Sequence, residues 1–478
     1  MRDWSDESGS LNFIALRGLY GRDELKPRDV AKTVIGRIAR RGKDGVWIYL
    51  EPEEKVFARA EELESLAEGL SAEALLSRYP LYGLPFAIKD NIDWMGRPTT
   101  AGCPEYTYVP EKTAPAVERL LDAGTILIGK TNMDQFATGL VGVRSPYGVA
   151  RNPFDERFIP GGSSSGSAVA VSAGLVSFAL GTDTAGSGRV PAGFNNIVGL
   201  KPTRGLVSMS GVVPACRSLD CASVFALTVP DALEALRTMA EEDESDPFSR
   251  SVPHEWIKKS LADSSGGLRV GVPRKNQREF FGNENAEELF NGAIDRLRKM
   301  GTVVVEIDYT TFHETARLVY EGPWMAERYA AIREFFDAKP EALHPVTRDL
   351  IVKGRGYSAS DTFGGIYRLE GLKKITGKTW DDIDMMVVPT TGTIYSISDV
   401  ESDPIALNNN LSFYTNFMNL LDLCGIAVPN GFYSNGLPAG VTFIAPAFQE
   451  SGLCALGTAF QRESGLNLGA TPHPIPAE

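Results

Sequence analysis

Short apolar runs alternate with amphipathic stretches along most of the chain. Residues 27–42 place Val30, Val34 and Ile38 on one helical face, with a proline where the helix would begin and a glycine where it would end. The same spacing predicts further helices at 56–69, 116–124, 165–174, 230–244 and 286–301. Helices are therefore expected at intervals along the whole sequence.

Residues 84–90 form a short apolar run that predicts a buried strand ending at Lys89 and Asp90. Similar runs predict buried strands at 125–130, 175–183, 267–272, 302–309, 384–391 and 439–446. Alternating strands and helices are typical of an α/β protein with a large, parallel or mixed central β-sheet covered by helices on both faces. Because no Pro/Ser-rich tract, no block of five or more charged residues and no repeat interrupts the pattern, it favours one large domain.

Composition and charge exclude several classes of function. The 478 residues are 43% hydrophobic and 23% charged, which is typical of a globular protein. A formal net charge of −13 argues against a nucleic-acid or anionic membrane partner, and no apolar run reaches the roughly 20 residues that span a bilayer. Five sparse cysteines and a polar start over residues 1–20 predict a reduced, cytoplasmic protein. Cys216 and Cys221 are the only close pair and lack a partner Cys or His, so we expect no metal site and no cofactor.

The stretch from Ile159 to Leu200 contains seven serines and nine glycines but no histidine or cysteine. A phosphate-binding loop would need a lysine after Gly166, and none is present. A serine–histidine hydrolase would match the G-x-S-x-G pattern at 162–166, with Ser164 as the nucleophile. That alternative also needs a catalytic histidine, and no recognisable catalytic context surrounds any of His254, His313, His344 and His473.

A third alternative is a serine hydrolase whose general base is a lysine. Lysine accepts a proton only when it is neutral, and its ordinary pKa is about 10.4. Burial lowers the pKa of a lysine because it disfavours the charged form. Lys89 is the candidate base, since it ends a buried run after Phe86, Ala87 and Ile88.

Three motifs together resemble the amidase signature family in their order and separation: GLPFAIKDNID (83–93), GGSSSGSA (161–168) and GTDTAGSGRVPA (181–192). The resemblance covers roughly residues 20 to 465 and implies the amidase signature fold. It also implies a Ser–cisSer–Lys triad, with Ser187 as nucleophile, Ser163 as bridging serine and Lys89 as base. The family's cis peptide bond would lie between Gly162 and Ser163.

The resemblance also assigns roles around the nucleophile. It places the oxyanion hole at the backbone amides of Thr184, Ala185, Gly186 and Ser187. Many family members have glycine at the position of Ala185 and isoleucine at that of Gly188, but a single added methyl group should leave such a hole intact. We interpret Asp183 and Arg189 as a structural ion pair that brackets the turn.

Residues 132–148 and 319–332 resemble allophanate hydrolases in particular, as do Ala185 and Gly188. This resemblance implies hydrolysis of a terminal C–N amide bond of allophanate, which is urea carrying a carboxylate. The products would be ammonia and a carboxycarbamate that loses carbon dioxide.

The same resemblance implies that Arg328 and Tyr320, helped by the backbone of Gly139, hold the substrate carboxylate. A bidentate arginine suits that geometry. Tyr320 and Arg328 are eight residues apart, about two helical turns, so we expect them to share one helical face. From the residues alone, Arg328 would instead pair with Glu321 or Glu327 on an exposed helix.

The resemblance predicts a helical segment at 1–70 packed on the core, an amidase signature domain at 71–469 and a loose tail at 470–478. Related proteins often carry a C-terminal accessory domain for decarboxylation. We expect this domain to be absent here, so that a separate protein could supply its function. The family suggests a homodimer that acts on a small anionic amide. Three alternatives stay open: an amidase for carboxybiuret or another small amide, an A-type subunit of glutamyl-tRNA amidotransferase, or an inactive binding protein.

Overall fold

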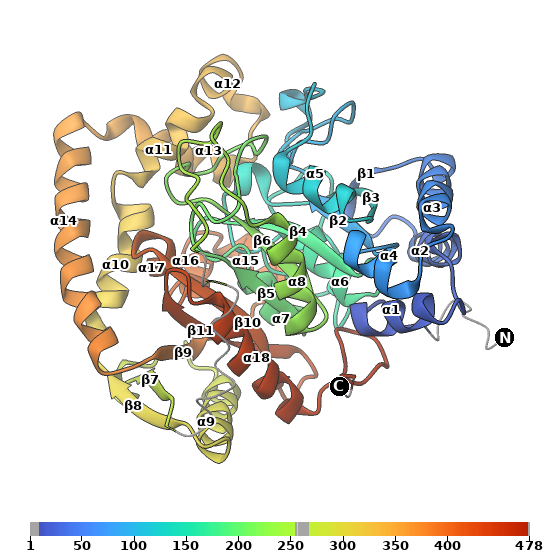
Figure 1. The fold of residues 1–478 in the computed structure, drawn as a ribbon. Coiled ribbons are helices and arrows are strands. Elements are labelled where there is room, and N and C mark those ends of the chain that lie inside the picture. Colours follow the sequence, from blue (N-terminus) through green and yellow to red (C-terminus); the bar gives the residue numbers. More distant parts are fainter. Residues whose placement is uncertain (1–8, 254–255, 257–266, 477–478) are drawn as a thin grey trace.

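The computed structural model describes residues 9–253, 256 and 267–476 (Figure 1). Its strands are β1 (Trp47–Leu50), β2 (Pro85–Lys89), β3 (Ile126–Thr131), β4 (Phe178–Asp183), β5 (Val198–Lys201), β6 (Cys221–Ala226), β7 (Arg269–Pro273), β8 (Val303–Ile307), β9 (Met385–Pro389), β10 (Leu423–Phe432) and β11 (Pro438–Pro446).

Its helices are α1 (Phe13–Gly21), α2 (Pro27–Arg41), α3 (Glu53–Ala67), α4 (Ala72–Arg78), α5 (Pro115–Asp122), α6 (Ser165–Ser172), α7 (Val190–Phe194), α8 (Val229–Met239), α9 (Glu284–Lys299), α10 (Thr310–Glu321), α11 (Trp324–Ala331), α12 (Arg333–Ala338), α13 (Pro345–Ile351), α14 (Ala359–Gly377), α15 (Ile397–Ser402), α16 (Ala406–Leu411), α17 (Phe417–Leu420) and α18 (Glu450–Ser464).

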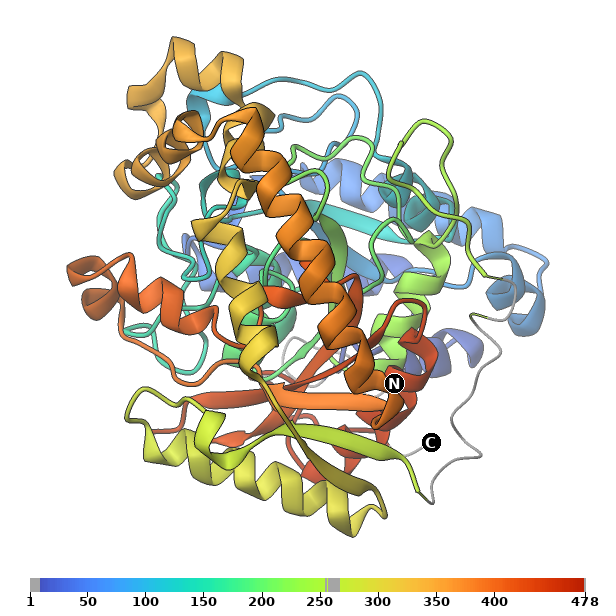
Figure 2. The same ribbon diagram turned by 90° about the vertical axis from the view of Figure 1, so that its left-hand side faces the viewer.

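The described strands form one 11-stranded sheet in the order β1-β3-β2-β4-β6-β5-β10-β11-β9-β7-β8. Strand β2 runs parallel to both β3 and β4, and β7 runs parallel to β8 and β9. The strands from β4 through β6, β5, β10 and β11 to β9 pair antiparallel. The sheet is therefore mixed, as the alternating pattern predicted, and Figure 2 shows its β7–β9 end beneath α10 and α14.

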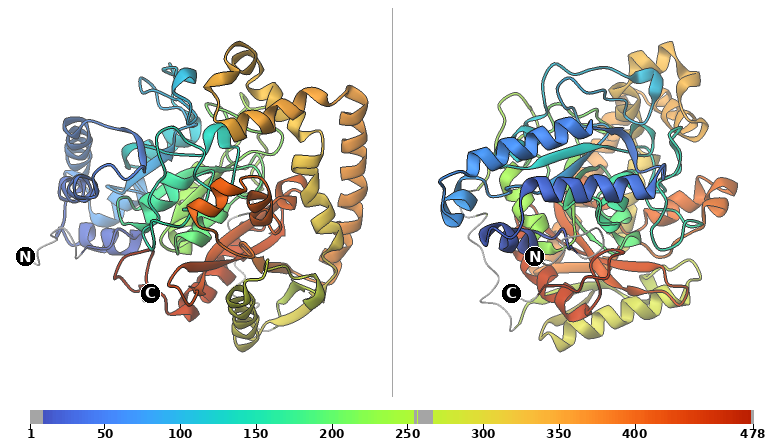
Figure 3. Two further views of the ribbon diagram at one scale, coloured as in Figure 1. Left: turned by 180° about the vertical axis from the view of Figure 1, so that it is seen from behind. Right: turned by 90° about the vertical axis from the view of Figure 1, so that its right-hand side faces the viewer.

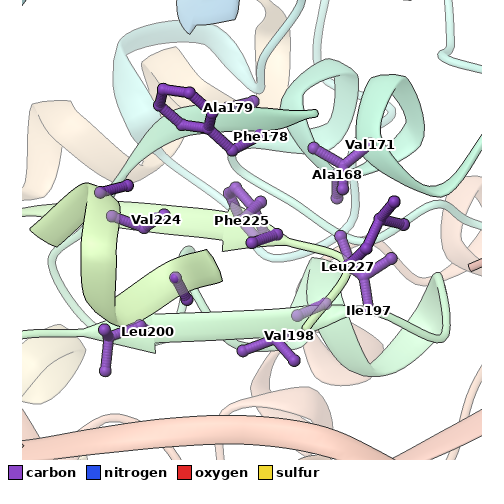
Figure 4. Packing of buried hydrophobic residues seen from close by; sticks show 14 of the residues in the cluster. Ala168, Val171, Phe178, Ala179, Ile197, Val198, Leu200, Val224, Phe225 and Leu227 are labelled. Atoms are coloured by element: carbon purple, nitrogen blue, oxygen red, sulfur yellow. The ribbon is translucent and has the colours of Figure 1, made fainter. Parts of the chain in front are cut away.

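Helices cover both faces of this sheet, and every residue of β2 to β6 is buried as a result. Helices α8 and α18 contact each other and lie over one face (Figure 1), whereas α6 and α7 contact each other on the opposite face (Figure 3). Figure 4 shows Phe178 of β4, Phe225 of β6 and Leu200 of β5 packed in the core between these layers, with Ala168 and Val171 of α6 beside them. This apolar packing makes the middle of the sheet a rigid base for the residues at its edge.

Two predicted elements differ from the structure. The helix predicted at 230–244 ends at Met239, because four consecutive acids at 241–244 would sit at its negative C-terminal end. The strand predicted at 302–309 was expected to be buried, but β8 lies at the edge of the sheet and Val303 is half exposed.

The structure also contains strands that the apolar pattern did not predict, namely β1, β5, β6 and β10. In β10 the pattern is interrupted by Pro429, which lies beside an irregularity in the pairing with β11. Strand β1 lies within residues 1–70 and pairs antiparallel with β3.

At the other end of the chain, Asn467 pairs with Pro474, and the amide of Gly469 donates to the carbonyl of Asn196. All five cysteines are buried thiols. Among the described helices, none combines the length and the apolarity that crossing a bilayer requires.

Candidate active site

Two neighbouring strands end at the same edge of the sheet, where the predicted catalytic residues lie. Strand β2 ends at Lys89 and β4 ends at Asp183, and the two strands are parallel with Ile88 opposite Leu180. Helix α6 packs on both strands, and the loop that precedes it brings Ser163 to this edge. Parallel strands present their carboxyl ends together, and α/β proteins commonly build their sites there.

Lys89 is completely buried and is surrounded by hydroxyl groups. Its Nζ atom donates to Oγ of Ser163 at 2.7 Å and to Oγ1 of Thr182 at 2.9 Å. No described carboxylate forms an ion pair with it. Burial lowers the pKa of Lys89 from 10.5 to about 7, although the more distant Asp134 and Asp220 oppose this shift. A large fraction of this amine is therefore neutral near pH 7, as a general base requires.

Lys130 provides an internal comparison, because it is also completely buried near the end of a strand. It lies opposite Ile88 in the register of β2 and β3. Its Nζ atom lies 3.5 Å from Oδ1 of Asp90, so this buried lysine has a carboxylate partner. Burial is thus common to both lysines, and an all-hydroxyl environment distinguishes Lys89.

Ser163 follows a cis peptide bond, Gly162–Ser163. A side chain at position 162 would clash, because a Cβ atom there would lie 2.1 Å from Oδ2 of Asp134. The carbonyl of Ser163 accepts a hydrogen bond from the amide of Asp134 at 3.0 Å. Position 162 therefore requires glycine, because this loop passes too close to Asp134 to leave room for a side chain.

Ser187, the predicted nucleophile, lies in the turn between β4 and α7 and is 3% exposed. After that prediction we call residues 184–189 the nucleophile turn. Oδ2 of Asp183 lies 2.8 Å from Nε of Arg189, and both side chains are completely buried. The same carboxylate accepts the amides of Gly186 at 2.8 Å and Gly188 at 3.0 Å. The ion pair predicted from the sequence is confirmed, and it fixes the shape of the turn.

The amide of Gly186 donates to Asp183, although the family resemblance placed this amide in the oxyanion hole. The other three predicted donors, the amides of Thr184, Ala185 and Ser187, donate to no described residue. The Oγ1 hydroxyl of Thr184 donates to Asp220 instead. Unengaged amides in a turn of small residues can bind an anionic oxygen.

The structure brings Lys89 and Ser163 into contact, but it does not bring the hydroxyl of Ser187 into a hydrogen bond with Ser163 or with any other described residue. Ser164, the alternative nucleophile, donates to the carbonyl of Thr182 at 3.2 Å. No described histidine hydrogen-bonds to it, and His254 lies outside the described residues.

The predicted substrate residues converge near this edge. The Cζ atom of Arg328 lies 5.5 Å from the ring centroid of Tyr320. Nη1 of Arg328 donates to Oγ1 of Thr138 at 3.3 Å, one residue before Gly139. The expectation that Tyr320 and Arg328 share one helix is wrong: α10 ends at Glu321 and α11 begins at Trp324, because Gly322 and Pro323 interrupt the helix.

The alternative pairing of Arg328 with Glu321 or Glu327 is also wrong. Glu321 pairs with Arg317 at 2.7 Å, and Glu327 accepts from the amide and hydroxyl of Ser218, each at 2.7 Å. Arg328 is 2% exposed, forms no ion pair with a described residue, and leaves Nε without a hydrogen-bond partner. A buried guanidinium without a carboxylate is costly unless a ligand supplies the negative charge.

Two residues beside the predicted triad were not predicted from the sequence. Thr182 accepts a hydrogen bond from Lys89. It lies in the segment GTDTAGSGR (181–189), and its position near the end of the predicted strand was the available signal. Asp220 is buried beneath Thr184 and accepts the amides of Ala215 and Cys216. Burial raises the pKa of Asp220 to about 6, and nothing in the local sequence indicated this contact.

Comparison with known proteins places this geometry in a family. The profile of the Amidase family matches residues 50–454. The urea amidolyase of Saccharomyces cerevisiae is 43% identical over 420 residues, which cover 87% of this chain and 22% of that protein. The A-type subunit of the glutamyl-tRNA(Gln) amidotransferase of Exiguobacterium sibiricum is 32% identical over 478 residues, covering 94% of this chain and 96% of that protein.

The solved structure of Kluyveromyces lactis allophanate hydrolase superimposes with a TM-score of 0.90 at 38% identity, covering 99% of this chain and 76% of that chain. These matches confirm the predicted resemblance to the amidase signature family and to allophanate hydrolases, and they confirm the predicted fold. The chain spans only 22% of the urea amidolyase sequences that it matches. By the match over residues 50–454, the chain belongs to the amidase family.

Proposed function

We propose that this protein hydrolyses a terminal C–N amide bond of allophanate through a Ser187–Ser163–Lys89 relay. The observation that carries the chemistry is the contact between a buried lysine and a serine hydroxyl, Lys89 Nζ to Ser163 Oγ at 2.7 Å. A lysine with a pKa of about 7 can accept a proton without an imidazole.

In the first step, neutral Lys89 takes the proton of Ser163 as Ser163 takes the proton of Ser187. This transfer requires the two serine hydroxyls to come within hydrogen-bond distance when substrate is bound. Oγ of Ser187 attacks the terminal amide carbon, and the negative oxygen is stabilised by the unengaged amides of Thr184, Ala185 and Ser187. Losing one such donor typically costs on the order of 3 kcal/mol of transition-state stabilisation.

In the second step, the proton held on Lys89 returns through Ser163 to the amide nitrogen, and ammonia leaves. The acyl group remains bonded to Oγ of Ser187. Water, deprotonated through the same relay, then attacks the acyl carbon and releases N-carboxycarbamate, which loses carbon dioxide. The proton taken from water passes through the relay to Oγ of Ser187 and replaces the one that left with ammonia, so the protein regenerates without a cofactor.

The environment of Arg328 supports the proposal that the substrate carries a carboxylate. It is a buried cation without a described carboxylate partner, and it lies beside Tyr320 and the loop that holds Gly139. Its guanidinium and the hydroxyl of Tyr320 can bind the substrate carboxylate, which would supply the missing negative charge.

Two other functions use the same chemistry. An amidase for carboxybiuret would need the same cation, because that substrate also carries a carboxylate. An A-type subunit of a glutamyl-tRNA amidotransferase is favoured by the 96% coverage of such a relative, but it would release ammonia from glutamine and would require companion subunits.

A side-by-side assay of ammonia release from allophanate, carboxybiuret, biuret, urea and glutamine separates these functions. Ser187→Ala and Ser163→Ala should each reduce the preferred activity by at least about 10³-fold. Ser165→Ala is the matched control, because its buried hydroxyl makes only a 3.5 Å contact with the carbonyl of Asn132. Full activity in Ser187→Ala would exclude the proposed nucleophile.

The proposal also covers an additional domain or protein, the cellular compartment and the domain limits. Decarboxylation of the product could be assisted by a further domain or a separate protein. Buried, unpaired cysteines support a reducing, cytoplasmic compartment. The proposed domain limits remain 1–70, 71–469 and 470–478.

A homodimer is also part of the proposal. Helix α14 lies along the outside of the molecule (Figure 2), and its outward face exposes Phe363, Tyr367 and Ile375 by more than half. Asp361 lies at its start and Lys374 near its end, so an antiparallel second copy would bring opposite charges together. Tyr367→Glu should shift sedimentation toward monomer, whereas Val109→Glu, at another exposed apolar position, should not.

A further inference from the structure

A cavity of about 440 Å³ opens between α10 and the segment that joins α16 to α17. Tyr320 forms part of its wall. Tyr320 also packs against the apolar cluster that contains Ala185 of the nucleophile turn, and its ring faces Arg328. The cavity therefore lies directly beside the residues to which the proposed function assigns substrate binding.

Asn416 lines this cavity with a side chain that has no partner. The residue is 2% exposed, and its Oδ1 atom is buried without a hydrogen bond. The preceding residue, Thr415, lies against the nucleophile turn: a Cβ atom added to Gly186 would lie 2.7 Å from its Oγ1. Asn416 thus projects into the cavity from a segment in contact with the turn that holds Ser187.

The two buried asparagines on the flanking helices, Asn408 of α16 and Asn419 of α17, have hydrogen-bond partners that the side chain of Asn416 lacks. Oδ1 of Asn408 accepts the amide of Leu140 at 2.9 Å. Nδ2 of Asn419 donates to the carbonyls of Asp183 at 2.8 Å and Leu219 at 2.9 Å. Buried carboxamides are normally hydrogen-bonded in this way, because an unsatisfied one costs stability.

We propose that Asn416 is a specificity-determining residue that binds the primary amide or urea group of the substrate in this cavity. A carboxamide offers one acceptor and two donors, which a primary amide matches with a reciprocal pair of hydrogen bonds. An ester or a tertiary amide lacks the matching donor. The inference rests on the proposed amide hydrolysis, and it assigns recognition of the amide end to Asn416 while Arg328 takes the carboxylate.

The test measures binding separately from turnover. Allophanate is titrated by calorimetry into Ser187→Ala and into the double variant Ser187→Ala/Asn416→Leu. Asn416→Leu keeps the volume but removes both hydrogen-bonding groups, so we expect the dissociation constant to rise about tenfold. Asn409→Leu is the matched control, because Asn409 lines the same cavity but is exposed. Its substitution should change the constant by less than about twofold.

Labelling of Ser187 by a small fluorophosphonate, which needs no amide recognition, checks that Asn416→Leu retains a folded site. Unchanged labelling with weaker allophanate binding supports the inference. Equal dissociation constants for the Asn416 and Asn409 variants would overturn the inference. A labelling rate of Asn416→Leu that falls as far as its affinity for allophanate would also overturn it, because that result indicates a structural role for Asn416. If the wild-type protein binds allophanate but releases no ammonia from any amide, the proposed function fails while the role of Asn416 is still measured. A wild-type protein that binds neither allophanate nor urea overturns both.

Discussion

Nζ of Lys89 lies 2.7 Å from Oγ of Ser163, and both residues are completely buried. The amine has hydroxyl neighbours and no described ion-pair partner, so desolvation dominates its charge state and its pKa falls to about 7. This contact links the fold to the proposed chemistry, because burial at the sheet edge gives the amine the low pKa that the proposed role as a base requires.

The first prediction concerns the pH dependence of turnover. Since the base must be neutral, kcat/KM for the preferred amide should rise with pH through an apparent pKa near 7 and level off above it. Initial rates of ammonia release between pH 5.5 and 9 measure this limb. A profile that is flat or falls with rising pH would rule out Lys89 as the base.

The second prediction compares the two buried lysines. Lys130→Met leaves the carboxylate of Asp90 buried without its cation and should lower the free energy of unfolding by about 3–5 kcal/mol. Lys89→Met should abolish activity but leaves no carboxylate unpaired, so it should destabilise far less. Urea denaturation of both variants tests this, and equal losses would contradict the environments described for the two amines.

The sign of the pH effect on stability gives a third prediction. The pKa of Lys89 is about 7 in the folded protein and 10.5 as a reference for the unfolded chain. Between these values the unfolded chain binds the extra proton, so wild-type stability should rise with pH relative to Lys89→Met. The free energy of unfolding of Lys89→Met, compared with that of the wild type, is therefore highest below pH 7. Unfolding free energies at pH 6.5 and 9.5 measure the difference, and an advantage of the variant that grows with pH would refute the assignment.

Much of the fold and of the candidate site could be predicted from the sequence because local patterns encode them. Strand β2 is a continuous apolar run, and α2 is bounded by a proline and a glycine, so both were located within a residue or two. The Asp183–Arg189 pair lies within a single turn, and its charges were therefore visible in the sequence.

Contacts between distant segments could not be predicted in this way. Asp220 meets Thr184 across 36 residues, and Asn416 gains its importance only from the cavity that α10 forms beside it. The eight-residue spacing of Tyr320 and Arg328 is compatible with one helix, but Pro323 interrupts it, so spacing alone does not predict the break between α10 and α11. Such features depend on tertiary packing, which local periodicity does not record.

A fourth prediction tests Thr182, whose hydroxyl accepts a hydrogen bond from Lys89 at 2.9 Å. An acceptor favours the charged amine, so Thr182→Val should move the acidic limb of the pH profile below pH 7. It should also lower kcat, by about tenfold, because the amine loses one of its two anchors. Thr442→Val is the control, since that buried hydroxyl pairs only with Thr390 on a neighbouring segment. If both variants keep the wild-type profile, Thr182 does not position the base.

The last prediction concerns Arg328, the buried cation without a described acidic partner. If it binds the substrate carboxylate, Arg328→Leu should reduce kcat/KM for allophanate by about 10²-fold, in line with loss of a charge-assisted hydrogen bond. Biuret, which has a carboxamide in place of that carboxylate, should lose much less. Arg328→Lys should fall between, because lysine keeps the charge without the bidentate fork.

Arg333→Leu controls for loss of a nearby positive charge, since Arg333 begins the next helix and is 70% exposed beside Asp337. Its substitution should alter neither substrate by more than about twofold. The informative quantity is the ratio of kcat/KM for allophanate to that for biuret, because a general structural defect lowers both together. A ratio unchanged in Arg328→Leu would remove Arg328 from carboxylate recognition, and the buried guanidinium would then need another source of negative charge.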